Sequence, residues 1–282
     1  MSFTTVLREI LTSNVGLDRF RYLAKGLVWQ CRKRLGHSFV TILPSGAKVS
    51  VHPNSSYSSI FYSKWPERKD LLFFRKNSYL GDTFVDVGAN VGLFSAFLFD
   101  SFRQFVLFEP ARSSYEAIGE TLSLNPGVSA YVANIGVADV AGELEFLDLG
   151  ACSSTSRFLT GGSYESLGQV VKVRCDTLDN RLANVDGGLL VKIDVEGFEE
   201  RVFLGARQLL REKRVRLVMF ERLGRTNIDS VRRFLESYAY KVFYVNRDGS
   251  ITFDDEAILT PMVNLFAAHV DDMRFLLCEK SA

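Results

Sequence analysis

The sequence predicts an α/β protein with a mostly parallel sheet and helices on both of its faces. From residue 83 onward, short apolar runs alternate with stretches of helical periodicity, a pattern typical of βα units. Several of the apolar runs end in a polar side chain, at Asp86, Glu109, Asn134, Asp194 and Glu221. Because the carboxyl ends of parallel strands share one edge of a sheet, we expect a ligand site at that edge.

Composition and charge argue against several classes of protein. The chain has 282 residues, 47% of them hydrophobic and 24% charged, which suits one large globular domain. A net charge of +1 offers no general attraction for nucleic acid, so no such partner is expected. The cysteines lack the close pairs typical of zinc sites, and no metal site is predicted. No apolar run reaches the ~20 residues of a membrane span or resembles a signal peptide, so a cytoplasmic location is expected.

Residues 1–36 are predicted to be helical. Residues 1–40 contain seven basic and two acidic residues, a net charge of +5. One interpretation is a helix packed on the domain with its basic side in solvent, which we favour because charged runs are usually solvated. The alternative is a weak contact of residues 1–40 with a membrane surface or another anionic partner. The apolar residues at helical spacing are Phe20, Leu23, Ala24, Leu27, Val28 and Cys31.

A β-hairpin and a second helix are expected before residue 80. Residues 39–43 and 47–51 are strand-like and flank Pro44-Ser45-Gly46, a sequence typical of a turn. Pro66 can begin a helix that extends to residue 79. These elements predict an N-terminal extension, residues 1–79, ahead of a main domain, residues 80–282.

The main domain is predicted to open with a strand at residues 83–87, a turn and a helix from Gly92. A Ser/Gly-rich loop, residues 150–168, lies between two alternating segments and has the length of a functional lid. The further predicted strands are residues 105–108, 128–133, 142–147, 169–174, 189–194, 216–220, 241–245 and 263–268, with a short strand or turn at 249–253. The further predicted helices are residues 111–124, 198–213 and 227–240.

The turn after the first strand of the main domain indicates the kind of ligand. Gly88 and Gly92 allow the backbone to turn sharply and a ligand to approach closely. A dinucleotide fingerprint needs glycines at its first, third and sixth positions, which here hold Gly88, Asn90 and Leu93. A nicotinamide-dependent oxidoreductase is therefore the weakest of the candidate functions.

Glu109 follows the next strand and has two interpretations. An acid at this position can accept hydrogen bonds from ribose hydroxyls, which we favour given the preceding glycine turn. It can instead cap the helix that begins near Ala111.

Several of these motifs together resemble the FkbM family of methyltransferases. They are the turn at residues 86–92, the Phe108-Glu109-Pro110 segment, the Asn134 region, and the Lys-Ile-Asp-Val-Glu-Gly stretch within residues 191–199. The resemblance covers roughly residues 80–270. It implies a Rossmann-like seven-stranded sheet whose last strand is antiparallel, S-adenosylmethionine as methyl donor, and a hydroxyl acceptor on a sugar, glycan or natural product. Smaller signatures are Thr177-Leu178-Asp179, Leu204-Gly205-Ala206 and Phe220-Glu221.

The resemblance also implies roles for individual residues. The ribose of the cofactor is expected at Glu109, and its adenine near Pro110 and Asn134. The residues expected at the amino-acid end of the cofactor are Asp86, Gly88, Ala89 and Asn90.

Transfer to a hydroxyl requires a base that removes its proton. No histidine lies in the matched motifs, so a carboxylate is expected: Asp194 first, Glu196 second, and Glu221 as a supporting or alternative base. Glu196 can equally be a structural acceptor that fixes the turn at Gly197. Lys192 can pair with one of these acids or point to the opposite face of its strand. A non-catalytic module that keeps the fold and binds a partner is the alternative function.

Overall fold

The computed structural model describes residues 10, 17–36, 38–52, 60–61, 63–150, 153, 155–159, 168–223, 227–260 and 262–278. Within these ranges no helix combines the length and the apolar character needed to cross a membrane.

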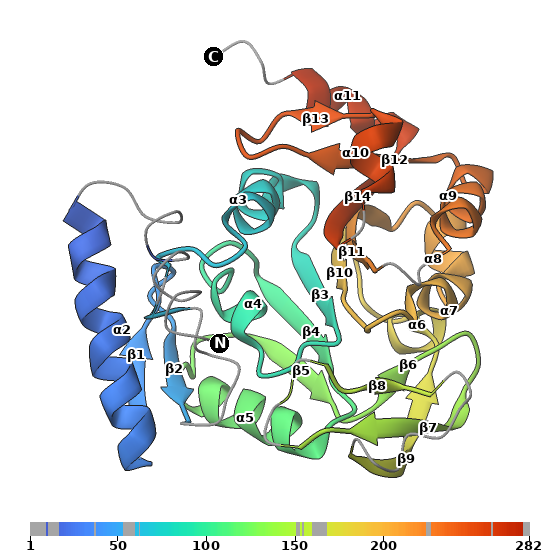
Figure 1. Ribbon diagram of the computed structural model, residues 1–282. Helices are drawn as coiled ribbons and strands as arrows, with labels where there is room; N and C mark the ends of the chain where they lie inside the picture. Colours follow the sequence, from blue (N-terminus) through green and yellow to red (C-terminus); the bar gives the residue numbers. More distant parts are fainter. Residues whose placement is uncertain are drawn as a thin grey trace.

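A single large sheet forms the centre of the molecule and confirms the predicted fold class (Figure 1). Neighbouring strands run parallel from β11 to β5, whereas β14 is antiparallel to both β11 and β12. The seven predicted strands are all present, and a two-residue strand, β13, extends one edge. In spatial order the described strands are β13 (Ile251–Thr252), β12 (Tyr240–Val245), β14 (Val263–His269), β11 (Val215–Arg222), β10 (Leu189–Ile193), β3 (Thr83–Val87), β4 (Gln104–Phe108) and β5 (Ala130–Ala133).

The two central strands, β3 and β10, are buried along their whole length because helices cover both faces of the sheet. Phe84 contributes to the core on one face and Val85 to the core on the other. Their two buried charged residues, Asp86 and Lys192, lie opposite each other in the β3–β10 register. This pair marks the edge of the sheet at which the site is built.

Helices pack on both faces of the sheet (Figure 1). One face is covered by α3 (Arg68–Lys76), α4 (Leu93–Ala96) and α5 (Arg112–Ser123). The other is covered by α6 (Leu178–Arg181), α7 (Glu199–Leu204), α8 (Arg207–Arg211) and α9 (Ile228–Ser237). Three further described elements are η2 (Ser78–Leu80), α10 (Asp255–Leu259) and α11 (Val270–Cys278).

The prediction of one continuous helix over residues 198–213 is wrong. The chain forms α7 and α8 instead, and the helix breaks at Gly205. Gly205 packs so closely on the next layer that a Cβ atom would lie 2.1 Å from the carbonyl oxygen of Ala138. The Asp179 carboxylate accepts hydrogen bonds from the N–H groups of Gln208 (2.9 Å) and Leu209 (3.0 Å). These bonds cap the start of α8, which follows the break as a separate helix.

A smaller four-stranded sheet stands beside the carboxyl edge of the main sheet. Its longest pair, β7 (Gly142–Asp148) and β9 (Gln169–Asp176), is antiparallel, as the alternating pattern predicted. The short strands β6 (Gly136–Val137) and β8 (Arg157–Phe158) flank this pair, and Phe146, Phe158 and Phe198 form its core.

The first described elements of the predicted N-terminal extension are α2 (Leu17–Leu35) and the predicted hairpin, β1 (Phe39–Ile42) and β2 (Lys48–Val51). Trp29 of α2 stacks on Phe61 with ring centroids 4.7 Å apart. Trp29 and Phe61 belong to the same buried core as Phe84 and Phe97 of the main domain. The helix packs on the domain, but Phe20 and Leu27, two of the apolar residues found at helical spacing in the sequence, are exposed. The division at residue 79 stays a prediction.

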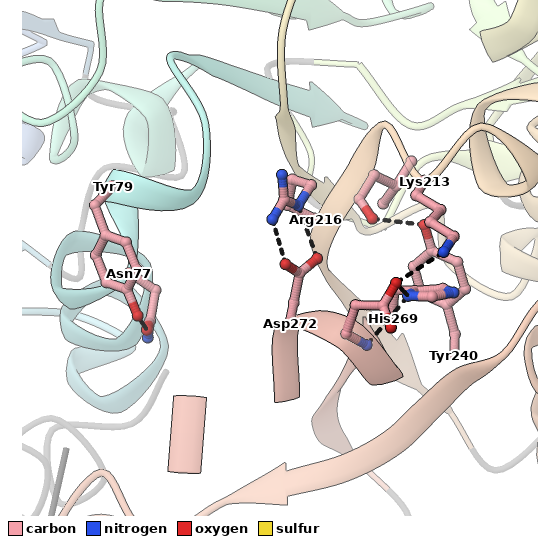
Figure 2. A network of polar contacts seen from close by, with 9 residues as sticks. Asn77, Tyr79, Lys213, Arg216, Tyr240, His269 and Asp272 are labelled. Carbon is pink, nitrogen blue, oxygen red and sulfur yellow. Dashed lines mark hydrogen bonds and ion pairs between the residues drawn. The ribbon is translucent and has the colours of Figure 1, made fainter. Parts of the chain in front are cut away.

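The last described helix, α11, is held to the sheet by charged groups (Figure 2). Arg216 of β11 donates to both carboxylate oxygens of Asp272, with the Nε bond at 2.7 Å. Asp272 is only 3% exposed. The Tyr240 hydroxyl donates to the Val215 carbonyl oxygen at 2.6 Å and ties β12 to the start of β11.

We predict that Asp272→Ala lowers the free energy of unfolding by about 2–3 kcal/mol, because it leaves the Arg216 guanidinium without its bidentate partner. Chemical denaturation measures this loss. Asp271→Ala is the matched control, since its pair with Lys213 is exposed and its removal should cost much less. Equal losses in the two variants would show that the Arg216 pair is not the anchor.

Candidate active site

Two cavities open on either side of the turn at residues 88–90, at the carboxyl ends of β3, β4 and β10. Gly88, Asn90 and Asp194 line both of them. The first cavity is also lined by Phe108, Glu109, Pro110, Ile135, Gly136, Phe158 and Glu196, among others. The second cavity is also lined by Pro66, Glu67, Leu71, Leu93, Phe94, Phe97 and Lys192, among others.

Gly88 makes the turn possible. Its φ is 75°, in the left-handed region, and a Cβ atom would lie 2.0 Å from the Asp194 carbonyl oxygen. The N–H groups of Gly88 and Ala89 donate to the Phe108 carbonyl oxygen at 3.0 and 3.1 Å. The turn at Gly88 therefore joins the carboxyl ends of β3, β4 and β10.

Glu109 holds the turn from the neighbouring strand. Its Oε2 accepts from the N–H of Asn90 (2.7 Å) and its Oε1 from the N–H of Ala111 (2.8 Å). The second bond holds the residue that precedes α5, so Glu109 also supports the start of that helix. Each carboxylate oxygen can accept more than one hydrogen bond, so these two bonds leave Glu109 able to receive ribose hydroxyls in the first cavity. Burial raises the pKa of Glu109 to about 7, although the two backbone donors oppose this shift.

Asn90 and Asn134 have different surroundings. Asn90 lies in the left-handed region with φ 50° and accepts a hydrogen bond from the Ser114 hydroxyl at 3.2 Å. Asn134 donates through Nδ2 to the carbonyl oxygens of Glu109 (2.8 Å) and Pro110 (2.9 Å). Asn134 thus fixes the Glu109-Pro110 segment, and Pro110 itself lines the first cavity.

Lys192 points toward the acids and resolves the alternative left open by the sequence. Its Nζ lies 3.4 Å from Asp86 Oδ1, 3.1 Å from Asp194 Oδ2 and 3.4 Å from the Gly88 carbonyl oxygen. Burial alone would lower the pKa of Lys192, but Asp194 and Asp86 outweigh it and hold that pKa above its usual value. Asp86 is fully buried below the turn, where Ser95 also donates to it at 2.6 Å. Asp86 therefore supports the turn from beneath.

The three predicted catalytic carboxylates come together. Asp194, Glu196 and Glu221 each offer an oxygen, and these oxygens lie within 4.8 Å of one another. Burial raises the pKa of Glu221 to about 8, and the charges of Asp194 and Glu196 add to the shift. Such a group of carboxylates can accept a proton or hold a hard divalent cation, although the sequence led us to expect no metal.

The Gly197 turn is held by an acid that the sequence analysis missed. Glu199 Oε1 accepts from the Gly197 N–H at 3.0 Å, and Glu199 is fully buried. Glu199 therefore fills the structural role that was considered for Glu196. Glu196 lines the first cavity with a left-handed backbone, φ 57°. Glu199 could have been found from the sequence, because it is an acid in the first turn of α7.

Two further residues of the site escaped the sequence analysis. Glu67 lines the second cavity beside Lys192 and Asp194, and it has a left-handed backbone with φ 50°. Such strain in a residue other than glycine is common at functional sites. Phe158 covers Gly136 so closely that a Cβ atom there would lie 2.2 Å from its ring. Phe158 belongs to the predicted lid, of which residues 151, 152, 154, 160–167 lie outside the described part.

The residues of the first cavity suit a nucleoside. Pro110, Ile135 and Phe158 offer an apolar wall for a flat base, and Glu109 offers an acceptor for ribose hydroxyls. Gly88 lines both cavities, and in the second one the charged groups of Glu67, Lys192 and Asp194 can meet an amino-acid group. The arrangement fits S-adenosylmethionine, with Phe158 and Glu67 added to the expected binding residues.

We predict that Gly88→Ala weakens S-adenosylmethionine binding more than about tenfold and costs about 3 kcal/mol or more of stability, because its Cβ displaces Asp194. Gly249→Ala is the matched control: its φ is 82°, but nothing lies within 4 Å of the added carbon. The control should show only the backbone cost of about 1–2 kcal/mol. Calorimetric titration and thermal unfolding measure both effects, and equal behaviour of the two variants would contradict the close contact.

The buried acids predict how stability depends on pH in the ligand-free protein. Burial raises the pKa of Glu109 and Glu199 to about 7 and that of Glu221 to about 8. The folded chain then binds protons more tightly than the unfolded chain, so stability should fall as pH rises from about 5 to about 8. Glu221→Gln should reduce this fall, whereas Glu143→Gln, at an exposed position, should not. Unfolding temperatures that rise over this interval would contradict the prediction.

Solved structures that resemble the chain are methyltransferases with low sequence identity. The ribosomal protein L11 methylase of Lactobacillus delbrueckii subsp. bulgaricus is 12% identical, with a TM-score of 0.40 over 72% of this chain and 77% of that one. The tRNA (uracil-54, C5)-methyltransferase of Pyrococcus abyssi, in complex with S-adenosyl-L-homocysteine, is 17% identical, with a TM-score of 0.41 over 82% and 43%. An O-methyltransferase from Bacillus cereus is 13% identical, with a TM-score of 0.39 over 72% and 80%.

A search of curated proteins found no match. The comparison with protein families, by contrast, is specific. The methyltransferase FkbM domain matches residues 86–242, from the Asp86 strand to β12, and this is more than half of the chain. The match includes the glycine turn, Glu109 and the three clustered carboxylates. The chain therefore belongs to the FkbM methyltransferase family, whose methyl donor is S-adenosylmethionine.

Proposed function

We propose that this methyltransferase transfers the methyl group of S-adenosylmethionine to a hydroxyl oxygen on a small molecule, a natural product or a glycan. The observation that carries the proposal is the carboxylate cluster of Asp194, Glu196 and Glu221. A hydroxyl is a weak nucleophile until its proton is removed, and a base beside the donor site supplies that function. The cluster adjoins both cavities through Asp194.

The histidines of the described chain do not provide this base. His52 lies beside Ser38 and Glu120, and His269 lies at the end of β14 beside Tyr240. Neither contributes to the cavities around Gly88. The cluster of carboxylates is then the better source of a base for the acceptor.

Glu221 and Asp194 are suited to different tasks within the cluster. Asp194 is paired with Lys192 at 3.1 Å, which fixes the position of its carboxylate. Glu221 has a pKa raised to about 8, so it takes up a proton more readily than an ordinary glutamate. We assign the proton acceptor to Glu221, with Glu196 as its neighbour, and the orientation of the acceptor hydroxyl to Asp194.

The remaining residues bind and orient. When bound, S-adenosylmethionine supplies a methyl group on a sulfonium, which is already a good leaving group. Glu109 would hold the ribose, and Pro110 and Phe158 would enclose the adenine. The protein's main task is then to hold the acceptor oxygen in line with the methyl group, which is a positioning effect. A cytoplasmic location, expected from the sequence, remains part of this proposal.

Calorimetric titration with S-adenosylmethionine tests the binding half of the proposal. The wild type should bind, and Glu109→Ala should bind at least about tenfold more weakly, because the turn and the ribose lose one acceptor. Glu116→Ala, an exposed acid of α5, is the matched control and should bind normally. Absence of binding by the folded wild type would overturn the proposed cofactor site.

Transfer of a radiolabelled methyl group to a library of hydroxyl compounds and glycans tests the chemical half. Turnover by the wild type should increase as pH rises through about 8, because Glu221 must lose its proton to act. Glu221→Gln should abolish this increase of turnover with pH and lower kcat by about 10²–10⁴, while cofactor binding stays intact. Cofactor binding without methylation of any acceptor would favour the non-catalytic module instead. If the pH dependence of turnover is unchanged in Glu221→Gln, the base is Asp194 or Glu196 instead of Glu221.

A further inference from the structure

Helix α2 has two apolar faces, and only one of them is packed on the domain. The buried face consists of Tyr22, Gly26 and Trp29, which follow one another at helical spacing. Tyr22 is 5% exposed and Trp29 is 1% exposed. Figure 1 shows α2 at the outer edge of the molecule, next to β1, so its opposite side faces away from the sheet.

That opposite side carries a continuous apolar stripe. Positions 20, 24, 27, 31 and 35 follow at intervals of three or four residues, so their side chains share one face of the helix. Phe20 is 73% exposed, Leu27 59% and Leu35 68%. Side chains of this size are seldom so exposed together on one helix face, and such a stripe indicates a contact surface. The stripe is Phe20, Ala24, Leu27, Cys31 and Leu35, with Val28 at its margin.

Basic residues border the stripe on both sides. Arg21, Lys25 and Arg32 share a row with Val28 along one margin, and Arg19 and Arg34 lie along the other. The whole of α2 contains six basic residues and one acidic residue, a net charge of +5. Long basic side chains beside an apolar stripe can place their stems on apolar groups and their charges in a polar layer.

The neighbouring hairpin extends the apolar surface. Val40 and Ile42 of β1 are 52% and 66% exposed. Together with Val28 of α2 they line a groove whose rim includes Arg21 and Arg32. The exposed apolar surface is thus not confined to one helix, and the same charges border all of it.

We propose that α2 and β1 bind the surface of an anionic phospholipid bilayer. The stripe would enter the boundary between headgroups and acyl chains, and the basic residues would meet the lipid phosphates. This docking is peripheral, because α2 would lie in the plane of the bilayer surface. It is independent of the proposed acceptor.

The charge pattern favours a lipid surface over the two other occupants. A second copy of this chain would bring two helices of net charge +5 together, which is unfavourable. A protein partner would have to place acidic groups opposite the basic residues on both margins of the stripe. A bilayer needs only an apolar stripe with flanking cations, and α2 supplies both.

Flotation of the full chain with lipid vesicles tests this proposal. The chain should float with phosphatidylcholine vesicles that contain phosphatidylglycerol, and much less with phosphatidylcholine alone or at high salt. Phe20→Glu and Leu27→Glu should each reduce binding about tenfold or more. Val140→Glu is the matched control: Val140 is 56% exposed on the main domain, far from α2 in sequence, and its change should leave binding intact.

A charge variant distinguishes the contribution of the basic residues from that of the apolar stripe. Arg21→Gln combined with Arg34→Gln should weaken binding to anionic vesicles, whereas Arg103→Gln, an exposed control, should not. Circular dichroism and S-adenosylmethionine titration should be unchanged in all variants, because α2 does not line the cavities around Gly88. Three results would overturn the proposal: no flotation of the wild type, flotation that survives the stripe variants, or self-association that Leu27→Glu abolishes without any lipid binding.

Discussion

The buried ammonium of Lys192 is the interaction on which the rest of the site depends. It lies between the carboxylates of Asp86 and Asp194 and within 3.4 Å of the Gly88 carbonyl oxygen, so it links β3, β10 and the turn between them. A buried charge of this kind is unfavourable unless it is paired on more than one side. The two acids provide that pairing, which explains why charged residues occupy the centre of an otherwise apolar sheet.

The same arrangement creates the conditions for chemistry. Glu196 and Glu221 lie close to Asp194, and burial together with these neighbouring charges raises the pKa of Glu221 to about 8, although the charge of Lys192 opposes the shift. A raised pKa of this kind lowers the stability of the ligand-free protein as pH rises through it, and it is also what the proposed base requires. Strain is also stored in the backbones of Glu67, Asn90 and Glu196, which lie in the left-handed region around the two cavities.

Several features were predictable because they are local. The strand at residues 83–87, the turn at Gly88 and the acids that end each strand follow from periodicity and from spacing along a short segment. The break at Gly205 and the packing of α2 were not predictable in this way. The break depends on Asp179, 29 residues away from the Gln208 N–H it caps, and on contact with Ala138. The buried face of α2 is the one that carries Trp29, because Trp29 stacks on Phe61 there.

The sequence alone was enough to predict the fold class, the family and the glycine turn, because periodicity and short motifs carry them. It also singled out Asp194, Glu196 and Glu221 as acids near strand ends, but these acids meet only because β10 and β11 pair in the sheet. Only the tertiary structure decided that Lys192 points toward the acids, that Glu199 rather than Glu196 holds the Gly197 turn, and that Glu67 and Phe158 join the site. It also decided that the longer apolar stripe of α2 faces outward. The physical reason is the same in each case: side-chain direction and burial depend on partners that the chain brings together only when it folds.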